Sequence, residues 1–278
     1  MNSRIRLEGK ALLVGNCARL FLISALSFIL RYGAVTGTAI LLSHIYKKDI
    51  IASLTSQYPP IAIYVTASLL SCILVFIVLM LTSGVRLGEN YIYSVRISGG
   101  TGSVKHLFRY LKPSDSFKAM CLFVKLNTLR IMWLVYFLLP CVILYFTAQN
   151  FTEMFGAIKI MESALMFIFL FILYISLCVF FVCTSRYTAA PYLLCNNMKT
   201  SINSVIKKSI LYTDAFLTEK FTLTASLFGW LLSCVVIIPA VYVIPYIKLE
   251  NAIFASEALQ QGRCPRSRFA VNIIGISM

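Results

Sequence analysis

Few residues in this chain have the types and spacing that acid–base, nucleophilic or metal chemistry needs. The two histidines, His44 and His106, lie on different polar edges, and the ten acidic residues are scattered over polar segments. No HExxH or GxSxG motif occurs, and no nucleophile stands with a base. We therefore predict that the protein is not an enzyme and uses no cofactor or catalytic metal. We also expect no acid deep in a membrane span, which argues against proton-coupled and cation transport.

Arg31 is a charged residue inside the first apolar run, in a context that includes Gly33 and Gly37. Such arginines usually face the interior of a helix bundle, pair with an acid or reach toward the interface. One interpretation is a ligand or ion contact; the other is a bend or helix start from which the side chain reaches the headgroups. Gly33 and Gly37 have the spacing of close helix contacts, a weak motif when it stands alone.

Two polar segments carry apolar residues at helical spacing, with lysine and arginine on the other side. In the first segment the apolar residues are Val104, Leu107, Phe108 and Leu111, and the second covers residues 201–211. Both patterns predict amphipathic helices at the level of the lipid headgroups. Together with Arg31, the candidate contacts for a ligand or lipid are Lys105, Arg109, Lys112, Lys207 and Lys208.

The composition is that of a helical membrane protein. Of the 278 residues, 59% are hydrophobic and 13% are charged, whereas soluble domains carry about 25% charged residues. The apolar runs are continuous rather than alternating, which argues against a β-barrel. The formal net charge is +15, and the basic residues cluster at the ends of these runs. Anionic membrane lipids are therefore the expected partners, with a membrane protein as a further candidate and nucleic acid excluded.

We predict an all-α, polytopic transmembrane bundle in one domain, residues 1–260, followed by a basic tail, residues 261–278. Apolar runs long enough to cross the roughly 30 Å hydrocarbon core identify five spans. These run from about Leu20 to Ile45, Ile61 to Thr82, Ile131 to Gln149, Ser163 to Thr184 and Phe221 to Tyr246.

The end of the chain leaves two topologies open. Either the chain turns near Pro239 and returns as a short sixth helix through Val241 to Leu259, or the basic tail is an external segment. We favour six helices, because a proline in the middle of a long apolar stretch offers the break. Eight cations between Ser83 and Arg130 predict that this segment is cytoplasmic, and the same holds for residues 186–220 and the N-terminus.

An internal repeat is predicted from two similar patterns about 100 residues apart. Thr82-Ser83 and Thr184-Ser185 are each followed by a basic amphipathic segment and then by an apolar run with tryptophan and proline. Because both basic segments should lie on one side, the pseudo-repeats should be parallel. The candidate structural anchors are Trp133, Pro140, Gly229, Trp230, Pro239, Pro245 and Tyr246.

Four blocks of the sequence stand out in order: residues 11–16 (Ala-Leu-Leu-Val-Gly-Asn), Trp133 to Pro140, the segment 221–230, which ends in Gly-Trp, and the pair Pro245-Tyr246. The first resembles the start, the second a later span, and the last two the C-terminal signature of a family of bacterial integral membrane proteins known as domain of unknown function number 975. The resemblance covers most of the chain and implies a bacterial plasma-membrane protein.

The chain also departs from that family. Cys141 stands where the family has glycine after proline, and an extra stretch, about Phe151 to Cys183, creates an additional span. The family resembles, more remotely, the membrane domain of glycerophosphodiester phosphodiesterases. The resemblance therefore implies a setting close to lipid, but no activity and no functional residue.

Three hypotheses follow from these features. The favoured one is a non-enzymatic membrane module that binds lipids or partners through its basic amphipathic helices. The alternative is a permease or exporter component with a pathway between the two repeats and Arg31 as an anion contact. The least favoured is a membrane-embedded enzyme acting on lipid, because the sequence lacks an acid–base cluster.

Overall fold

The computed structural model describes residues 2–55, 60–155, 159–233 and 237–261. Regular structure in these ranges is helical throughout, which confirms the predicted all-α class. The predicted basic tail lies almost entirely outside the described residues. The helices are α1 (Asn2–Leu13), α2 (Cys17–Thr55), α3 (Pro60–Ile97), the 3-10 helix η1 (Val104–Phe108), α4 (Pro113–Phe155), α5 (Lys159–Ser185), α6 (Ala190–Asn196), α7 (Ile202–Asp214), α8 (Leu217–Ser233) and α9 (Ile237–Gln261).

Four helices are long and apolar enough to cross a membrane, which indicates a multi-pass membrane protein. The qualifying segments lie in α2, α3, α4 and α5, and each contains between 28 and 35 residues. Helices suit such segments because they satisfy every backbone polar group without water. The segments are Cys17–His44, Ser68–Ile97, Pro113–Thr147 and Met166–Asn196, the last of which runs on through α6.

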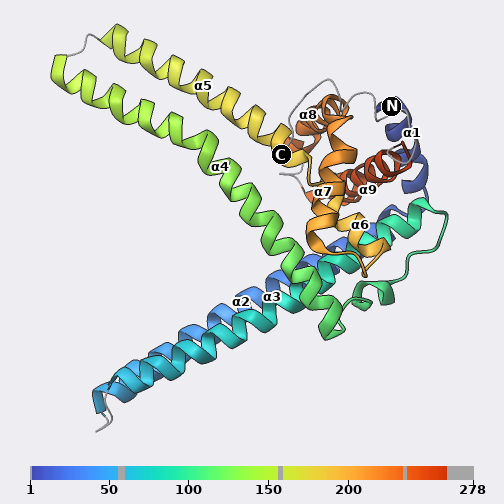
Figure 1. Cartoon of the computed structure of the whole chain (residues 1–278), viewed down its shortest axis with the longest axis horizontal. Helices are drawn as coiled ribbons and strands as arrows, with labels where there is room; N and C mark the ends of the chain where they lie inside the picture. Colours follow the sequence, from blue (N-terminus) through green and yellow to red (C-terminus); the bar gives the residue numbers. More distant parts are fainter. Residues whose placement is uncertain (1, 56–59, 156–158, 234–236, 262–278) are drawn as a thin grey trace.

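These four helices form two long hairpins that diverge from a compact helical part (Figure 1). Helix α2 packs against α3, and α4 packs against α5. Away from the compact part the apolar side chains are exposed; Phe167, for example, is 73% exposed. Exposed apolar surface on this scale is what lipid covers in a membrane protein, so the outer parts of both hairpins are suited to the hydrocarbon core.

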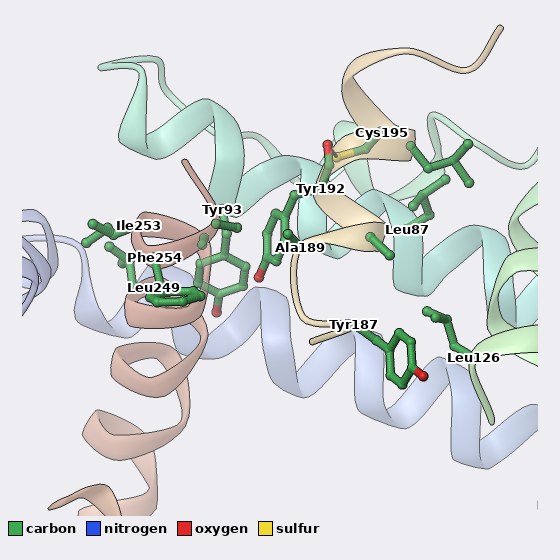
Figure 2. Packing of buried hydrophobic residues seen from close by; sticks show 14 of the residues in the cluster. Leu87, Tyr93, Leu126, Tyr187, Ala189, Tyr192, Cys195, Leu249, Ile253 and Phe254 are labelled. Atoms are coloured by element: carbon green, nitrogen blue, oxygen red, sulfur yellow. Dashed lines mark hydrogen bonds between the residues drawn. The ribbon is translucent and has the colours of Figure 1, made fainter. Parts of the chain in front are cut away.

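The compact part contains α1 and α6 to α9 together with the inner ends of α2, α3 and α4. Its core includes Tyr93 of α3, which lies beside Leu249 and Phe254 of α9 (Figure 2). Tyr93 and Phe254 are fully buried, and the Tyr93 hydroxyl is hydrogen-bonded to Ser24 Oγ of α2 at 2.7 Å. This packing fixes the inner end of the first hairpin, α2 and α3, to α9.

Helices α3 and α4 extend far into the segment that was predicted to be a polar loop, so the prediction of a loop is wrong for most of that segment, whereas the membrane limits of the second and third spans stay predictions. Helix α3 continues beyond Thr82 to Ile97, and α4 begins at Pro113 rather than Ile131. The prediction placed the limits of both spans beside charged residues. The charged inner ends of α3 and α4 are nevertheless helical, because protein covers them. Leu87 and Leu122, for example, are completely buried.

Two glycines of α3 provide the surface on which residues 104–111 pack. A Cβ atom on Gly88 would lie 2.2 Å from the Leu107 carbonyl oxygen, and one on Gly84 would lie 2.8 Å from that of Tyr110. Only glycine permits so close a backbone approach. Gly33 and Gly37, which the sequence suggested for a close contact, have open space around their Cα atoms instead.

The first predicted amphipathic helix is wrong in form. Residues 104–108 make one turn of 3-10 helix, in which Leu107 is buried while Val104 and Phe108 are each 44% exposed. Pro113 begins α4 a few residues later, and the residue before a proline disfavours helical backbone. The short segment therefore cannot continue as an α-helix.

The second predicted amphipathic segment is a helix, α7, although its position at the lipid headgroups stays a prediction. Val205 and Ile206 are buried, whereas Lys207 and Lys208 are exposed. Ser201 caps its N-terminus by accepting a hydrogen bond from the Ser204 amide.

The expectation of one continuous span from Phe221 to Tyr246 is wrong. Helix α8 ends at Ser233 and α9 begins at Ile237. Lys220 of α8 is hydrogen-bonded to Asn251 of α9, whereas a continuous helix would place residues this far apart in sequence roughly 45 Å from each other. The chain therefore turns near Pro239 and comes back as α9. Pro239 lies in the first turn of α9, where a missing N–H costs nothing.

Neither the five-span count nor the pseudo-repeat is confirmed. Within the described residues, α8 and α9 are not among the helices long and apolar enough to cross a membrane. The two tryptophan–proline patterns also adopt different structures. Helix α4 is continuous through Pro140, whereas the chain between Trp230 and Pro239 is divided between α8 and α9.

Several of the predicted anchors make packing contacts. The Trp133 indole donates a hydrogen bond to the Tyr187 hydroxyl at 3.0 Å and stacks on Phe137. Tyr246 is buried and stacks on Tyr242. Pro140 lies exposed inside α4, and Pro245 is buried inside α9. The side-chain surroundings of Gly229, Trp230 and Pro239 lie outside the described part of the structure.

Candidate functional site

A buried carboxylate joins α2, α3 and α9 where the first hairpin enters the compact part. Glu89 Oε2 accepts a hydrogen bond from Ser27 Oγ at 2.8 Å and lies 3.4 Å from Nη2 of Arg31. Its other oxygen, Oε1, accepts a hydrogen bond from Nζ of Lys248. The Glu89 side chain is only 4% exposed, so two cations compensate one desolvated carboxylate.

Arg31 is therefore paired with an acid, an arrangement that neither of the two interpretations of this residue named. Its Nε also donates to the Ser27 carbonyl oxygen at 3.1 Å. Glu89 lies within the apolar segment Ser68–Ile97, but on the buried inner end of α3, beyond the exposed part of the hairpin. The expectation that no acid lies deep in a membrane span therefore stays a prediction.

Two further arginines lie near this cluster without a carboxylate of their own. Arg86 of α3 interacts electrostatically with Arg31, Arg130 and Glu89, and its guanidinium lies 4.4 Å from the centre of the Phe123 ring. Within the described residues, neither Arg86 nor Arg130 forms an ion pair or a hydrogen bond through its side chain. The cluster thus has one carboxylate for four cations.

This charge cluster marks the level at which the exposed parts of the hairpins begin. Beyond Arg31, no described side chain of α2 is buried, and the described part of α3 before Ser83 contains no buried residue either. Beyond Arg130, helix α4 likewise carries an uncharged run as far as Thr152. Three helices therefore carry an arginine at the boundary between the compact part and the apolar hairpins.

The structure brings the two basic sequence segments together on the compact part. Lys118 Nζ donates a hydrogen bond to the Met198 carbonyl oxygen at 2.6 Å, and Lys125 donates to Asn203 Oδ1. We call the cations of segments 104–125 and 195–208 the basic face. Its residues are Lys105, Arg109, Lys112, Lys118, Lys125, Lys199, Lys207 and Lys208, and Asp115 is the one acid in these two sequence segments.

All five surface cations predicted as contacts belong to the basic face and are exposed. Lys105, Lys112, Lys207 and Lys208 extend to the surface, while Arg109 donates a hydrogen bond to the Tyr91 hydroxyl and lies over its ring. A phosphate or carboxylate approaching this surface therefore meets several cations without displacing an internal ion pair.

A second buried pair of charges lies between α8 and α9. Burial lowers the pKa of Lys220 to about 8, although Glu250 opposes the shift. Burial also raises the pKa of the Glu250 carboxyl, although a hydrogen bond with the Tyr246 side chain and the charges of Arg6, Lys220 and Lys10 oppose it. Both carboxylate oxygens of Glu250 are inaccessible to water.

Sequence reasoning missed Glu89, Arg86, Arg130 and Lys248 as members of one site. A signal was present: Arg86, Glu89 and Tyr93 recur at helical spacing, so they share one face of α3. Ending the predicted span at Thr82 hid that face, because it placed all three residues in a loop. The partner Lys248 could not be found in this way, because α9 is remote in sequence.

Comparison with protein-family models, curated proteins and solved structures finds no match for this chain. Among the residues that the structure describes, no group of three or more His, Cys, Asp or Glu side chains could hold a metal ion.

Proposed function

We propose that the protein is a non-enzymatic, multi-pass membrane module that binds anionic lipid headgroups through the basic face beside its hairpins. The proposed location is a bacterial plasma membrane, with the N-terminus and both basic segments on the cytoplasmic side. We also propose that the chain is related to the family of bacterial membrane proteins described above.

The observation that carries this proposal is the joining of the two basic segments. Lys105 and Lys208 are about 100 residues apart in sequence, yet their segments adjoin through the Lys118–Met198 and Lys125–Asn203 contacts. A surface with eight cations, attached directly to membrane hairpins, stays within reach of the headgroups. Anionic leaflets attract such clusters by about 1 kcal/mol for each lysine or arginine close to the surface.

The transport alternative has weaker support. It requires a pathway between two repeats, and the repeat is not confirmed. Its anion contact, Arg31, is already engaged by Glu89 and the Ser27 carbonyl oxygen. A lipid-binding surface uses cations that are exposed and unpaired with acids, which is why we prefer it.

The test is a lipid titration of the purified protein, read by native mass spectrometry at two salt concentrations. We expect phosphatidylglycerol to bind in several copies, more tightly than phosphatidylcholine, and to be weakened by salt. The Lys207→Gln/Lys208→Gln variant should bind phosphatidylglycerol about 30-fold more weakly, which corresponds to about 2 kcal/mol for two charges.

The matched control removes two exposed cations elsewhere, in Arg19→Gln/Lys47→Gln. This control should bind phosphatidylglycerol like the wild type. Equal binding of both lipids, or equal losses in the two variants, would exclude the basic face as the lipid contact.

A further inference from the structure

At the partly buried base of the hairpins, cationic side chains outnumber acidic ones. Arg31 and Lys248 contact a single carboxylate, Glu89, and Arg86 interacts electrostatically with Arg31, Glu89 and Arg130. Arg86 and Arg130 are both half-buried and lack an acidic partner within 4 Å among the described residues. A cation that loses water without gaining a counter-ion is costly, so this arrangement favours binding of an anion.

The arginines are held in ways that leave N–H groups available. The Arg86 guanidinium carbon lies over the Phe123 ring, 4.4 Å from its centre, and none of the Arg86 side-chain N–H groups donates a hydrogen bond among the described residues. Arg31 uses Nε and Nη2 for Ser27 and Glu89, so its Nη1 has no partner among the described residues. Guanidinium edges of this kind match the oxygens of phosphate, which they bind through paired, charge-assisted hydrogen bonds.

The position of these arginines identifies the source of the phosphate. They lie on α2, α3 and α4 where the two hairpins diverge, and the uncharged, exposed helix surface begins directly beyond them (Figure 1). A soluble anion would not contact that apolar surface. A phospholipid would place its headgroup at the arginines and its acyl chains along the diverging hairpins.

We propose that Arg31, Arg86 and Arg130 bind the phosphate of one anionic phospholipid, whose acyl chains lie between the two hairpins. Glu89 and Lys248 position Arg31 in this site. The site is distinct from the basic face, because it holds a single lipid by hydrogen bonds rather than several by surface charge. It can therefore exist even if the basic face binds nothing.

The test uses the full-length protein in detergent, stripped of lipid and titrated with phosphatidylglycerol under native mass spectrometry. Salt at 1 M screens the exposed charges of the basic face strongly, but it screens a partly buried pair of arginine and phosphate much less. One phosphatidylglycerol should therefore remain bound in 1 M salt. Arg86→Gln and Arg130→Gln should each weaken that last lipid by at least about tenfold, because each removes charge-assisted hydrogen bonds. Lys207→Gln/Lys208→Gln should leave it unchanged.

Two further arms separate the source of the phosphate and the effect of folding. Inorganic phosphate at millimolar concentration should neither bind detectably nor displace the lipid; displacement would show a site for soluble phosphate and overturn the lipid assignment. Arg86→Lys keeps the charge but loses the paired hydrogen bonds, so it should fall between Arg86→Gln and the wild type. The proposal would also be overturned if Arg86→Gln and Arg130→Gln both retained the last lipid as tightly as the wild type, with thermal unfolding unchanged. If Arg86→Gln unfolds, Arg130→Gln and the phosphate competition decide alone.

Discussion

Replacing Glu89 by glutamine should destabilise the protein through the two cations that it leaves behind. In the wild type the carboxylate is 4% exposed and accepts from Ser27, Arg31 and Lys248. Removing one member of a fully buried ion pair costs roughly 3 to 5 kcal/mol. The Arg31 and Lys248 side chains keep 21% and 31% of their exposure and can regain water, so we expect about 2 to 3 kcal/mol for Glu89→Gln.

This cost should appear as a fall of roughly 5 to 10 °C in the midpoint of thermal unfolding, measured by intrinsic tryptophan fluorescence in detergent. Lys248→Met should cost less, about 1 kcal/mol, because Glu89 keeps Arg31 and Ser27. The control is Glu8→Gln, which removes an exposed helical pair with Arg4 and should change stability by no more than about 0.5 kcal/mol. If Glu89→Gln melts like the wild type, or Lys248→Met is the more damaging change, the cluster does not join the hairpin to α9.

Three further outcomes follow from particular residues. Gly88→Ala should lower the melting temperature far more than Gly33→Ala does. A Cβ atom at Gly88 would lie 2.2 Å from the Leu107 carbonyl oxygen, whereas Gly33 has open space around it. Similar melting temperatures of the two variants would refute the packing of η1 on α3. Burial raises the pKa of Glu250, so the folded state binds a proton more tightly than the unfolded state, and this contribution to stability is present below the unfolded pKa and lost as pH rises through the raised one. Glu250→Gln should therefore gain stability over the wild type at pH 8 but not at pH 4, and a gain independent of pH would count against a buried, ionisable Glu250. The pKa of Lys220 is lowered to about 8, so the wild type should become more stable relative to Lys220→Met as pH rises from about 8 toward 10.5, and a flat difference in melting temperature would show that Lys220 is not buried.

The sequence predicted the membrane helices well because their signal is local. A continuous apolar run specifies a helix in lipid whatever its neighbours are, and the runs that became α2 to α5 were all found. The inner ends of these helices were missed for the same reason. Beyond Thr82 the α3 helix passes from lipid into protein, where Glu89 can be buried because Ser27, Arg31 and Lys248 pair with it.

Only part of the candidate site could be predicted from the sequence. The surface cations Lys207 and Lys208 were found, because an amphipathic helix shows its polar side in its own periodicity. That their segment adjoins the segment of Lys105 depends on contacts such as Lys118 with Met198, which no local pattern encodes. The arginines at the base of the hairpins were likewise assigned to separate elements, since only the crossing of α3 and α4 brings Arg86 near Arg130.

The measurement that bears most directly on lipid binding is to extract the protein with its surrounding membrane in polymer nanodiscs and quantify every lipid that co-purifies. We expect anionic phospholipid enriched over the bulk membrane, with one copy retained per chain after exchange into detergent. That copy should be lost from Arg86→Gln/Arg130→Gln. Lipid in bulk-membrane proportions, equal for the wild type and this variant, would mean that neither the basic face nor the arginines at the hairpin base select a lipid.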